Sequence, residues 1–332
     1  MACGNIGFAA KRWWFRFVPG EPDVILRRIP HWAVLLSWLW VVPSLLAAEP
    51  VFPPELVQWT SASQNPVFTA GGEGTWDVAI RERGFLLRED DGYHMWYTGY
   101  DGTREGLKML GYATSPDGIH WQRHPGNPVY RAHWVEDMMV VRQGNTYYMF
   151  AEGKDDQSHL LTSRDRIHWT RQGPLDIRLT TGKPIEPGPY GTPVGWYEEG
   201  TWYLFYERRD LGVWLATSCD MQVWRNVQDD PVMRPGPEKY DRDLIAMNQI
   251  LKYRGRYYAT YHGTASEPKP NLWAPALATS TDLIHWTKYP GNPLQPIEAN
   301  RSSNILVPEG DRFRMYTMHG RVELFLHHDA SQ

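Results

Sequence analysis

Several residue types and motifs that mark common protein classes are scarce or missing in this chain. Only two cysteines, Cys3 and Cys219, occur among its 332 residues, too few for a disulfide framework or a cysteine-based metal site. The sequence has no Gly-rich phosphate loop, no nucleotide-binding fingerprint and no paired-histidine metal motif, so we expect no cofactor and no metal from its motifs. The formal net charge is −4, which argues against a nucleic acid as partner.

The first 48 residues differ from the rest of the chain. The apolar run AVLLSWLWVVPSLLAA (33–48) follows two arginines and is about as long as the hydrophobic region of a secretory signal, which is short for a membrane span. We therefore expect residues 1–48 to be a signal peptide. An uncleaved N-terminal anchor is the alternative, because Leu45 or Leu46 would occupy a position where a cleavage site favours a small residue.

Removal of residues 1–48 would change the rest of the protein in two ways. This segment carries five Lys or Arg and two Asp or Glu, a net of +3, so the remainder would carry −7. Cys3 would also be lost, which leaves no disulfide within the chain. Residues 49–332 are then expected to form a single secreted or periplasmic domain that contacts no membrane and binds no nucleic acid.

What the chain has in abundance is an internal repeat. One nine-residue phrase occurs four times, as ATSPDGIHW, LTSRDRIHW, ATSCDMQVW and ATSTDLIHW, ending at Trp121, Trp169, Trp224 and Trp286. Ser and Asp side chains can bond nearby backbone groups and fix a turn, and the Trp can fill the space between neighbouring sheets. We therefore predict structural roles for the four aspartates of the phrase, Asp117, Asp165, Asp220 and Asp282.

Each copy of the phrase follows two short alternating runs joined by a tight polar turn. Examples are MMVVRQGNTYYMFAEG (138–153) and NQILKYRGRYYATYHG (248–263), and a fifth such pair is NILVPEGDRFRMYTMHG (304–320). Two such runs form a β-hairpin; the phrase would lead a third strand into a fourth. Four strands per unit, repeated radially, predict an all-β, five-bladed β-propeller.

The fifth hairpin has only one further strand after it, and the missing strand has a counterpart near the N-terminus. QWTSASQNPVF (58–68) matches HWQRHPGNPVY (120–130), and in both the Trp lies six residues before an Asn-Pro pair. We expect this N-terminal strand to join the last blade, which would close the ring and protect the edge of the sheet.

Acidic side chains near the entrances of the innermost strands are the candidates for chemistry, because a propeller gathers its active groups around the axis. Asp77 precedes the first hairpin and Asp137 directly precedes the apolar run of the second, while Glu207 ends a strand of the third. Cleavage of a glycosidic bond needs one carboxylic acid and one carboxylate, and a third acid can hold their pKa values apart. For Asp77 and Asp137 the structural alternative is a strand-end cap or an ion pair.

A second group of candidates follows from the equivalent ends of second strands. Four titratable residues occupy these ends in blades two to five, namely Glu152, Glu207, His262 and His319. A single histidine at such a place is more often a core residue than a functional one. We expect these residues, with Arg83, Glu136 and Arg208, to contact a carbohydrate; Arg81, Arg83 and Arg208 could bind an acidic sugar.

The hairpins YHMWYTGYDG (93–102) and WYLFYERRD (202–210), together with the repeated turn, resemble those of the five-bladed β-propeller glycosidases over about residues 56–328. This broad group includes arabinanases, xylosidases, invertases and agarooligosaccharide hydrolases. The resemblance implies an Asp base or nucleophile in blade one, a pKa-tuning Asp in blade two and a Glu acid in blade three. It also implies that an axial calcium ion could be present.

Asp77 and Asp137 match the first two family positions, and the third position departs from the pattern. The family Glu precedes the first strand of blade three, where this chain has PYGTPV with Thr192. Glu207 lies one strand later and Glu186 a few residues earlier. Further candidates are Glu82 and Glu136 and, since some relatives use a histidine as acid, His262 and His319.

Three functions remain open at this point. The first is a secreted glycoside hydrolase that acts on a plant- or algal-type oligosaccharide or polysaccharide by carboxylate acid/base catalysis. The second is a non-catalytic propeller that binds glycans or another protein, which the departure at PYGTPV supports. The third is a sialidase-like enzyme, because SPDGIHW approaches the turn of those enzymes; their six blades disagree with the five counted here.

Overall fold

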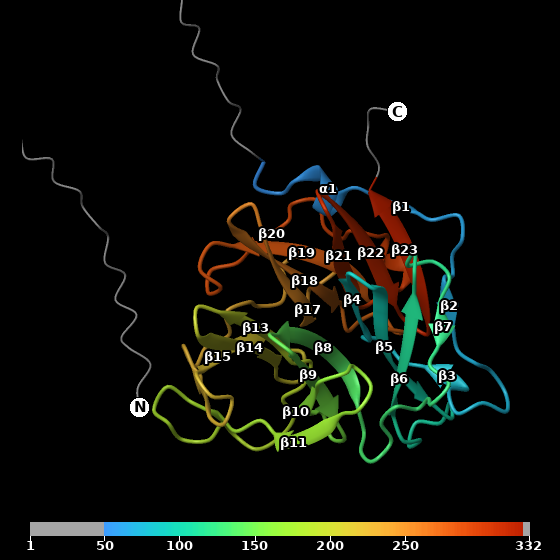
Figure 1. Ribbon diagram of the computed structural model, residues 1–332. Coiled ribbons are helices and arrows are strands. Elements are labelled where there is room, and N and C mark those ends of the chain that lie inside the picture. Colours follow the sequence, from blue (N-terminus) through green and yellow to red (C-terminus); the bar gives the residue numbers. More distant parts are fainter. Residues whose placement is uncertain (1–49, 328–332) are drawn as a thin grey trace, which may run out of the picture. The chain divides into compact units, whose positions relative to one another are not determined.

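The computed structural model describes residues 50–327, and the expected signal peptide lies outside this range. The described residues form five antiparallel sheets arranged around a central axis (Figure 1). The helices are limited to α1 (Pro54–Val57) and the 3-10 turn η1 (Ile297–Ala299). Within residues 50–327, no helix has the length and apolar character that a membrane crossing requires. The prediction of an all-β, five-bladed propeller is confirmed.

Each blade takes its strands in chain order from the axis outward. Blade 1 contains β3 (Ala79–Ile80), β4 (Phe85–Glu89), β5 (Gly92–Tyr100), β6 (Met109–Ser115) and β7 (Gln122–Arg123). Blade 2 contains β8 (Glu136–Gln143), β9 (Thr146–Gly153), β10 (Gln157–Ser163) and β11 (Thr170–Pro174). Blade 3 contains β13 (Val194–Glu198), β14 (Thr201–Glu207), β15 (Val213–Ser218) and β16 (Trp224–Asn226), and β12 (Ile177–Arg178) runs parallel to β16.

The last two blades follow the same order. Blade 4 contains β17 (Leu244–Tyr253), β18 (Arg256–Thr264), β19 (Ala274–Ser280) and β20 (Thr287–Lys288). Blade 5 contains β21 (Asn304–Glu309), β22 (Arg312–Met318) and β23 (Arg321–His327). Two short N-terminal strands, β1 (Trp59–Ser61) and β2 (Phe68–Thr69), pair with β23. The register of β1 places Trp59 opposite His327 and Ser61 opposite Phe325.

The repeated phrase forms the turn from the third to the fourth strand in four blades, as predicted. In blade 1 the Oδ1 atom of Asp117 accepts hydrogen bonds from the backbone N–H groups of Ile119 and His120, both at 2.9 Å. Asp165, Asp220 and Asp282 accept backbone hydrogen bonds in the same way. These contacts account for the four aspartates as turn residues.

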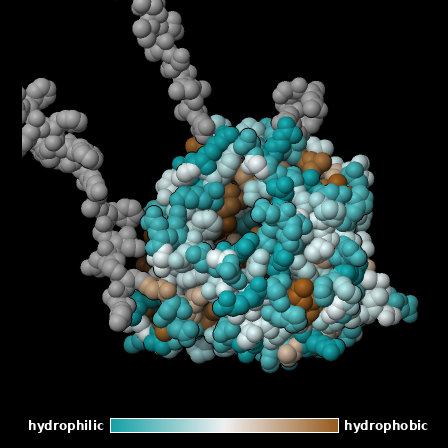
Figure 2. Space-filling model, in the orientation of Figure 1, coloured by the Kyte–Doolittle hydropathy of each residue, from teal (hydrophilic) through white to brown (hydrophobic). Residues whose placement is uncertain are grey.

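The tryptophan that ends each phrase packs between neighbouring blades. Trp169 of blade 2 meets Trp96 of blade 1 at a ring distance of 6.1 Å, and Trp224 of blade 3 meets Phe150 of blade 2 at 5.9 Å. The equivalent pairs are Trp121 with Tyr316 and Trp286 with Phe205. In every case the partner comes from the second strand of the adjacent blade, so one recurring residue joins four of the five pairs of neighbouring blades. Figure 2 shows a hollow near the centre of one face of this arrangement.

Candidate active site

A cavity of about 170 Å³ lies where the innermost strands begin and the second strands end. We call it the axial pocket. Six carboxylic acids and three arginines contribute to its wall, so the pocket is strongly polar and carries an excess of acidic groups. Its lining residues are Arg81, Glu82, Arg83, Asp137, Glu152, Asp156, Thr192, Glu207, Arg209, Asp210, His262 and Trp273.

The start of each innermost strand has an irregular backbone that places a side chain at this level. Arg83, Asp137 and Thr192 have φ angles of 54°, 50° and 47°, in the left-handed region that non-glycine residues rarely adopt. Asp137 lies in a bulge of β8, and in blade 4 the register shifts at Asn248. Bulges redirect side chains, and strain of this kind is concentrated at functional sites. A left-handed residue near the start of the innermost strand therefore brings side chains of blades 1, 2 and 3 to the axial pocket.

Asp137 and Arg83 form a buried ion pair in this pocket. The distance from Asp137 Oδ2 to Arg83 Nη2 is 2.5 Å, and the two residues are 5% and 8% exposed. The other carboxylate oxygen, Asp137 Oδ1, and the Nε and Nη1 atoms of Arg83 are buried and make no hydrogen bond to any residue of the described range. Unsatisfied buried polar atoms are costly, so these three atoms mark the pocket as a candidate binding site for a polar ligand.

Glu152 and Glu207 converge on the loop that precedes β13. Gly191 N–H donates to Glu207 Oε1 at 3.0 Å, and Thr192 N–H donates to Glu152 Oε2 at 2.9 Å. A Cβ atom on Gly191 would lie 2.2 Å from Glu152 Oε2 and 2.6 Å from Glu207 Oε1, so only glycine allows both carboxyl groups to approach this backbone. Burial raises the pKa of both glutamates, well above the usual value for Glu152.

Asp210 contributes a half-buried carboxyl group to the axial pocket. Its backbone N–H donates to Glu207 Oε2 at 2.5 Å, and its carbonyl accepts from Ile245 N–H at 2.8 Å, which holds the residue in place. Its side chain makes no hydrogen bond or ion pair within residues 50–327. Burial, reinforced by the charge of Glu207, raises the pKa of Asp210 to about 7. A carboxyl group with this pKa can donate a proton near neutral pH.

The remaining titratable groups around the pocket are held by partners. Burial lowers the pKa of His262 well below its usual value, and its Nδ1 lies 2.8 Å from Asn248 Oδ1. Burial, together with the charge of Asp137, raises the pKa of Glu136 to about 7, although Arg81 Nε lies 2.8 Å from this carboxylate. His319 does not line the pocket; its Nδ1 lies 3.2 Å from Oε2 of Glu82, which does.

Asp77 lies outside the axial pocket, contrary to the sequence prediction. It is 1% exposed, and its Oδ2 lies 3.0 Å from Arg123 Nε on β7. Tyr97 donates to the same oxygen at 3.2 Å, and Asn127 Nδ2 donates to the Tyr97 hydroxyl at 3.2 Å. The Asp77 carboxylate therefore connects residues of β5 and β7 within blade 1. This agrees with the structural alternative, an ion pair, that the sequence left open for Asp77.

Blade 4 repeats this arrangement residue for residue. Asp241 Oδ2 lies 2.5 Å from Lys288 Nζ on β20, and Tyr261 donates to it at 3.3 Å. Asn292 Nδ2 then donates to the Tyr261 hydroxyl at 3.3 Å. Because the same three contacts occur in two blades that differ in their axial residues, we assign Asp77 a structural role.

This assignment predicts the behaviour of an Asp77→Asn variant. Loss of the ion pair with Arg123 is expected to lower the free energy of unfolding by about 1–3 kcal/mol, because the buried partner groups lose a charged hydrogen-bond acceptor. Activity per folded molecule is expected to stay within a few fold of the unmodified protein. Chemical denaturation and rate measurements on the same samples test this, and complete loss of turnover with normal stability would restore Asp77 as a catalytic residue.

Two other sequence predictions also change. Arg208 does not line the axial pocket, because its Nη2 donates to the Glu186 carbonyl at 2.8 Å; the next residue, Arg209, lines it instead. The Glu186 side chain is exposed and does not reach the pocket. Sequence analysis missed Asp210, Asp156 and Trp273, which lie on loops. The only sequence signal for Asp210 was the cluster of charges ERRD directly after β14.

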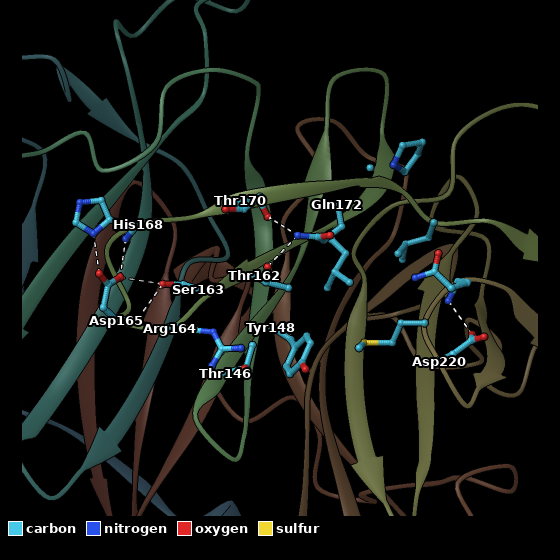
Figure 3. Close-up of a pocket in the computed structure, with 16 residues that line it drawn as sticks. Thr146, Tyr148, Thr162, Ser163, Arg164, Asp165, His168, Thr170, Gln172 and Asp220 are labelled. Atoms are coloured by element: carbon cyan, nitrogen blue, oxygen red, sulfur yellow. Dashed lines mark hydrogen bonds and ion pairs between the residues drawn. The ribbon is translucent and has the colours of Figure 1, made fainter.

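A second, larger cavity of about 630 Å³ lies between the outer parts of blades 2 and 3 (Figure 3). Its acidic residue Asp165 is bonded to Ser163 Oγ at 3.1 Å and to His168 Nδ1 at 2.7 Å within the repeated turn. The hydrogen bonds of Asp165 in this cavity thus serve to form the turn. The axial pocket, with its unsatisfied buried atoms, is the better candidate for an active site.

One group within the described range has the donors and spacing of a metal site. Glu89, Asp91 and His94 offer ligand atoms within 4.8 Å of one another. The guanidinium group of Arg166 already lies among them, with Nη1 at 3.0 Å from Glu89 Oε2 and 2.9 Å from Asp91 Oδ2. This arginine supplies the positive charge that a cation would otherwise provide, so we assign the group to the contact between blades 1 and 2.

Comparison with known sequences gives distant relatives. No family model matches the chain. It is 25% identical over 217 residues to a protein of Mycobacterium tuberculosis named as uncharacterized, which covers 60% of this chain and 72% of that protein. It is 24% identical over 225 residues to a 1,2-beta-oligomannan phosphorylase of a Thermoanaerobacter species, which covers 62% of this chain and 72% of the relative.

Solved structures of similar fold cover nearly the whole described range. A candidate glycosidase from Bacteroides thetaiotaomicron superposes with a TM-score of 0.67 at 18% identity, covering 85% of this chain and 99% of that one. A glycosyl hydrolase from Bacteroides ovatus gives 0.65 at 16% identity, with 82% and 94% covered. Beta-1,2-mannobiose phosphorylase from Listeria innocua gives 0.61 at 14% identity, with 81% and 96% covered. The chain therefore has the fold of the five-bladed propeller glycoside hydrolases and phosphorylases.

Proposed function

We propose that this protein is a carbohydrate-active enzyme that cleaves glycosidic bonds in the axial pocket. The observation that carries the proposal is the Asp137–Arg83 pair, whose buried polar atoms lack partners at the place where carboxyl groups of three blades converge. Paired carboxyl groups are what glycosidic cleavage requires. The names of the structural neighbours, a glycosyl hydrolase and a mannobiose phosphorylase among them, support the same class of reaction.

In this proposal three acids of the axial pocket, Asp210, Asp137 and Glu207, have different roles. Asp210 donates a proton to the oxygen of the leaving sugar, because its side chain has no partner within residues 50–327 and its pKa of about 7 leaves about half of it protonated at neutral pH. Asp137 acts as the carboxylate that faces the anomeric carbon, either through an activated water or directly. Glu207, fixed by two backbone N–H groups, raises the pKa of Asp210 through its charge.

We propose that water is the acceptor and that the substrate is a plant- or algal-type oligosaccharide. The enzyme would be secreted or periplasmic. The test is release of reducing sugar from such oligosaccharides and from β-1,2-mannobiose, each with and without inorganic phosphate. Turnover that does not depend on phosphate supports hydrolysis. Turnover that requires phosphate and yields a sugar phosphate would make the protein a phosphorylase, and binding without any turnover would support the non-catalytic alternative.

The role of Asp210 predicts a specific pH profile. A carboxyl group with a pKa near 7 is protonated below that pH and loses its proton above it, so kcat/KM should fall about tenfold per pH unit on the alkaline side. Rates measured from pH 5.5 to 8.5 test this. Since Glu136 also has a pKa of about 7, a Glu136→Gln variant serves as control and should keep the alkaline decline. A profile that is flat across this range would exclude Asp210 as the proton donor.

We propose in addition that β1 closes the ring of blades. Asn65 supports this, because its Nδ2 donates to the Leu324 carbonyl and its Oδ1 accepts from Leu324 N–H, both at 2.7 Å, as Asn127 does with Tyr112 in blade 1. Asn65→Ala is expected to lower the free energy of unfolding by about 1–2 kcal/mol in a denaturant titration. The exposed neighbour Gln64, changed to Ala, should leave stability unchanged, and equal effects of both changes would argue against ring closure here.

A further inference from the structure

A third cavity, of about 320 Å³, lies in blade 2 beside the axial pocket. Among the residues that line it within the described range, Lys154 and Arg171 are positively charged, His133 and His159 add imidazole rings, and no carboxylate takes part. The chain as a whole has a net charge of −4 and the axial pocket has more acids than bases, so this cavity differs from its surroundings. The other lining residues are Leu107, Ala132, Trp134, Gly153, Gln157 and Pro174.

The buried histidine of this cavity has an unused hydrogen-bonding atom. His159 on β10 is 3% exposed, and its Nδ1 lies 3.4 Å from the Gln157 carbonyl. Its Nε2 is buried and makes no hydrogen bond to any residue in 50–327. Burial, together with the charges of Arg171 and His133, lowers the pKa of His159 to about 4. The neutral ring can carry its proton on Nε2, which gives up the long Nδ1 contact, and it then offers a buried donor to an anion in the cavity that Arg171 and Lys154 also line.

Three links place this cavity next to the axial pocket. Gly153 and Gln157, which line the cavity, directly follow Glu152 and Asp156, which line the pocket. Trp134 also lines the cavity, and its Nε1 donates to Glu136 Oε1 at 2.5 Å. The two spaces are thus lined by adjacent residues of blade 2.

From these observations we propose that the cavity around His159 and Arg171 binds an oxyanion. The ligand is a carboxylate, sulfate or phosphate group, carried by a sugar unit that extends from the axial pocket or present as a free inorganic anion. Arg171 and Lys154 supply charge-assisted hydrogen bonds at the mouth, and His159 Nε2 completes the contact at the bottom. This binding does not require glycosidic cleavage, so it is testable whether or not the proposed reaction is correct.

The test is calorimetric titration of the full chain with inorganic phosphate, inorganic sulfate, glucuronate and, as a neutral match, glucose. We expect the anions to bind and Arg171→Gln and His159→Gln each to weaken that binding roughly tenfold, the effect of losing one charge-assisted or buried hydrogen bond. Arg171→Lys should restore part of it. Arg164→Gln is the matched control, because Arg164 is an exposed arginine on the larger cavity between blades 2 and 3.

The outcomes separate the sources of the anion. Tighter binding of glucuronate than of phosphate, with the same loss in both variants, identifies a charged sugar; the reverse order identifies a free inorganic anion. If no anion binds to the unmodified protein, or if Arg164→Gln weakens binding as much as Arg171→Gln, the proposal is wrong. Normal thermal unfolding of His159→Gln must accompany the titration, and Arg171→Gln, at an exposed residue, decides the matter if that variant is unstable.

Discussion

Substitution of Asp137 by Asn should lower kcat/KM of the folded protein by about 10²–10⁴-fold, and it should also lower the free energy of unfolding because the buried Arg83 loses its charged partner. The amide has the size of the carboxylate and can still accept a hydrogen bond from Arg83, whose Nη2 lies 2.5 Å from Asp137 Oδ2. It cannot activate water, attack the anomeric carbon or stabilise positive charge there. Steady-state rates and circular dichroism on the same preparation give the two measurements.

The matched control is the other buried aspartate that sequence analysis selected. Asp77→Asn makes the same chemical change at a residue that lies outside the axial pocket. Asp77 is 1% exposed and forms an ion pair with Arg123. The structure therefore predicts that both variants lose stability, because each breaks a buried ion pair, and that only Asp137→Asn loses activity per folded molecule. Equal activity of Asp137→Asn and the unmodified protein would remove the basis of the proposed reaction.

The second large effect is expected from Arg83→Met, and it concerns stability. Arg83 is the buried cation among the acids of the axial pocket, and it lies beside Asp137. Its removal leaves a buried carboxylate without its partner, which typically costs about 3–5 kcal/mol. Denaturant titration at pH 7 should show this loss of unfolding free energy.

A second arginine of the same pocket provides the control for this experiment. Arg209 lines the pocket but is exposed to solvent, so Arg209→Met should change the unfolding free energy by no more than about 0.5 kcal/mol. If both variants lose the same stability, the effect comes from the total charge of the pocket and not from the buried pair. If neither does, the pair contributes less than its burial implies.

The blade pattern could be predicted from the sequence because its signals are local and repeated. The phrase that ends at Trp169 or Trp224 specifies a turn through the hydrogen bonds of its own Ser and Asp. The tryptophan at its end then packs against an aromatic residue on the second strand of the adjacent blade. Each unit repeats the same order of hairpin and following strand, so the number of blades follows from counting the hairpins. Asp137, Glu152, Glu207 and His262 were found for the same reason, since each lies at a fixed place relative to a predicted strand.

The sequence by itself therefore determined the β-propeller, the number of its blades and the strand ends whose residues line the axial pocket. The tertiary structure alone decided which acids meet. Asp77 and Asp137 look alike in sequence, yet one is paired with Arg123 in the outer part of blade 1 and the other with Arg83 at the axis. Asp210 lies on a loop, where no periodic pattern fixes direction, and its pKa of about 7 arises from burial and from Glu207. Turns and strands depend on neighbours in the chain, whereas ion pairing and burial depend on residues that only folding brings together.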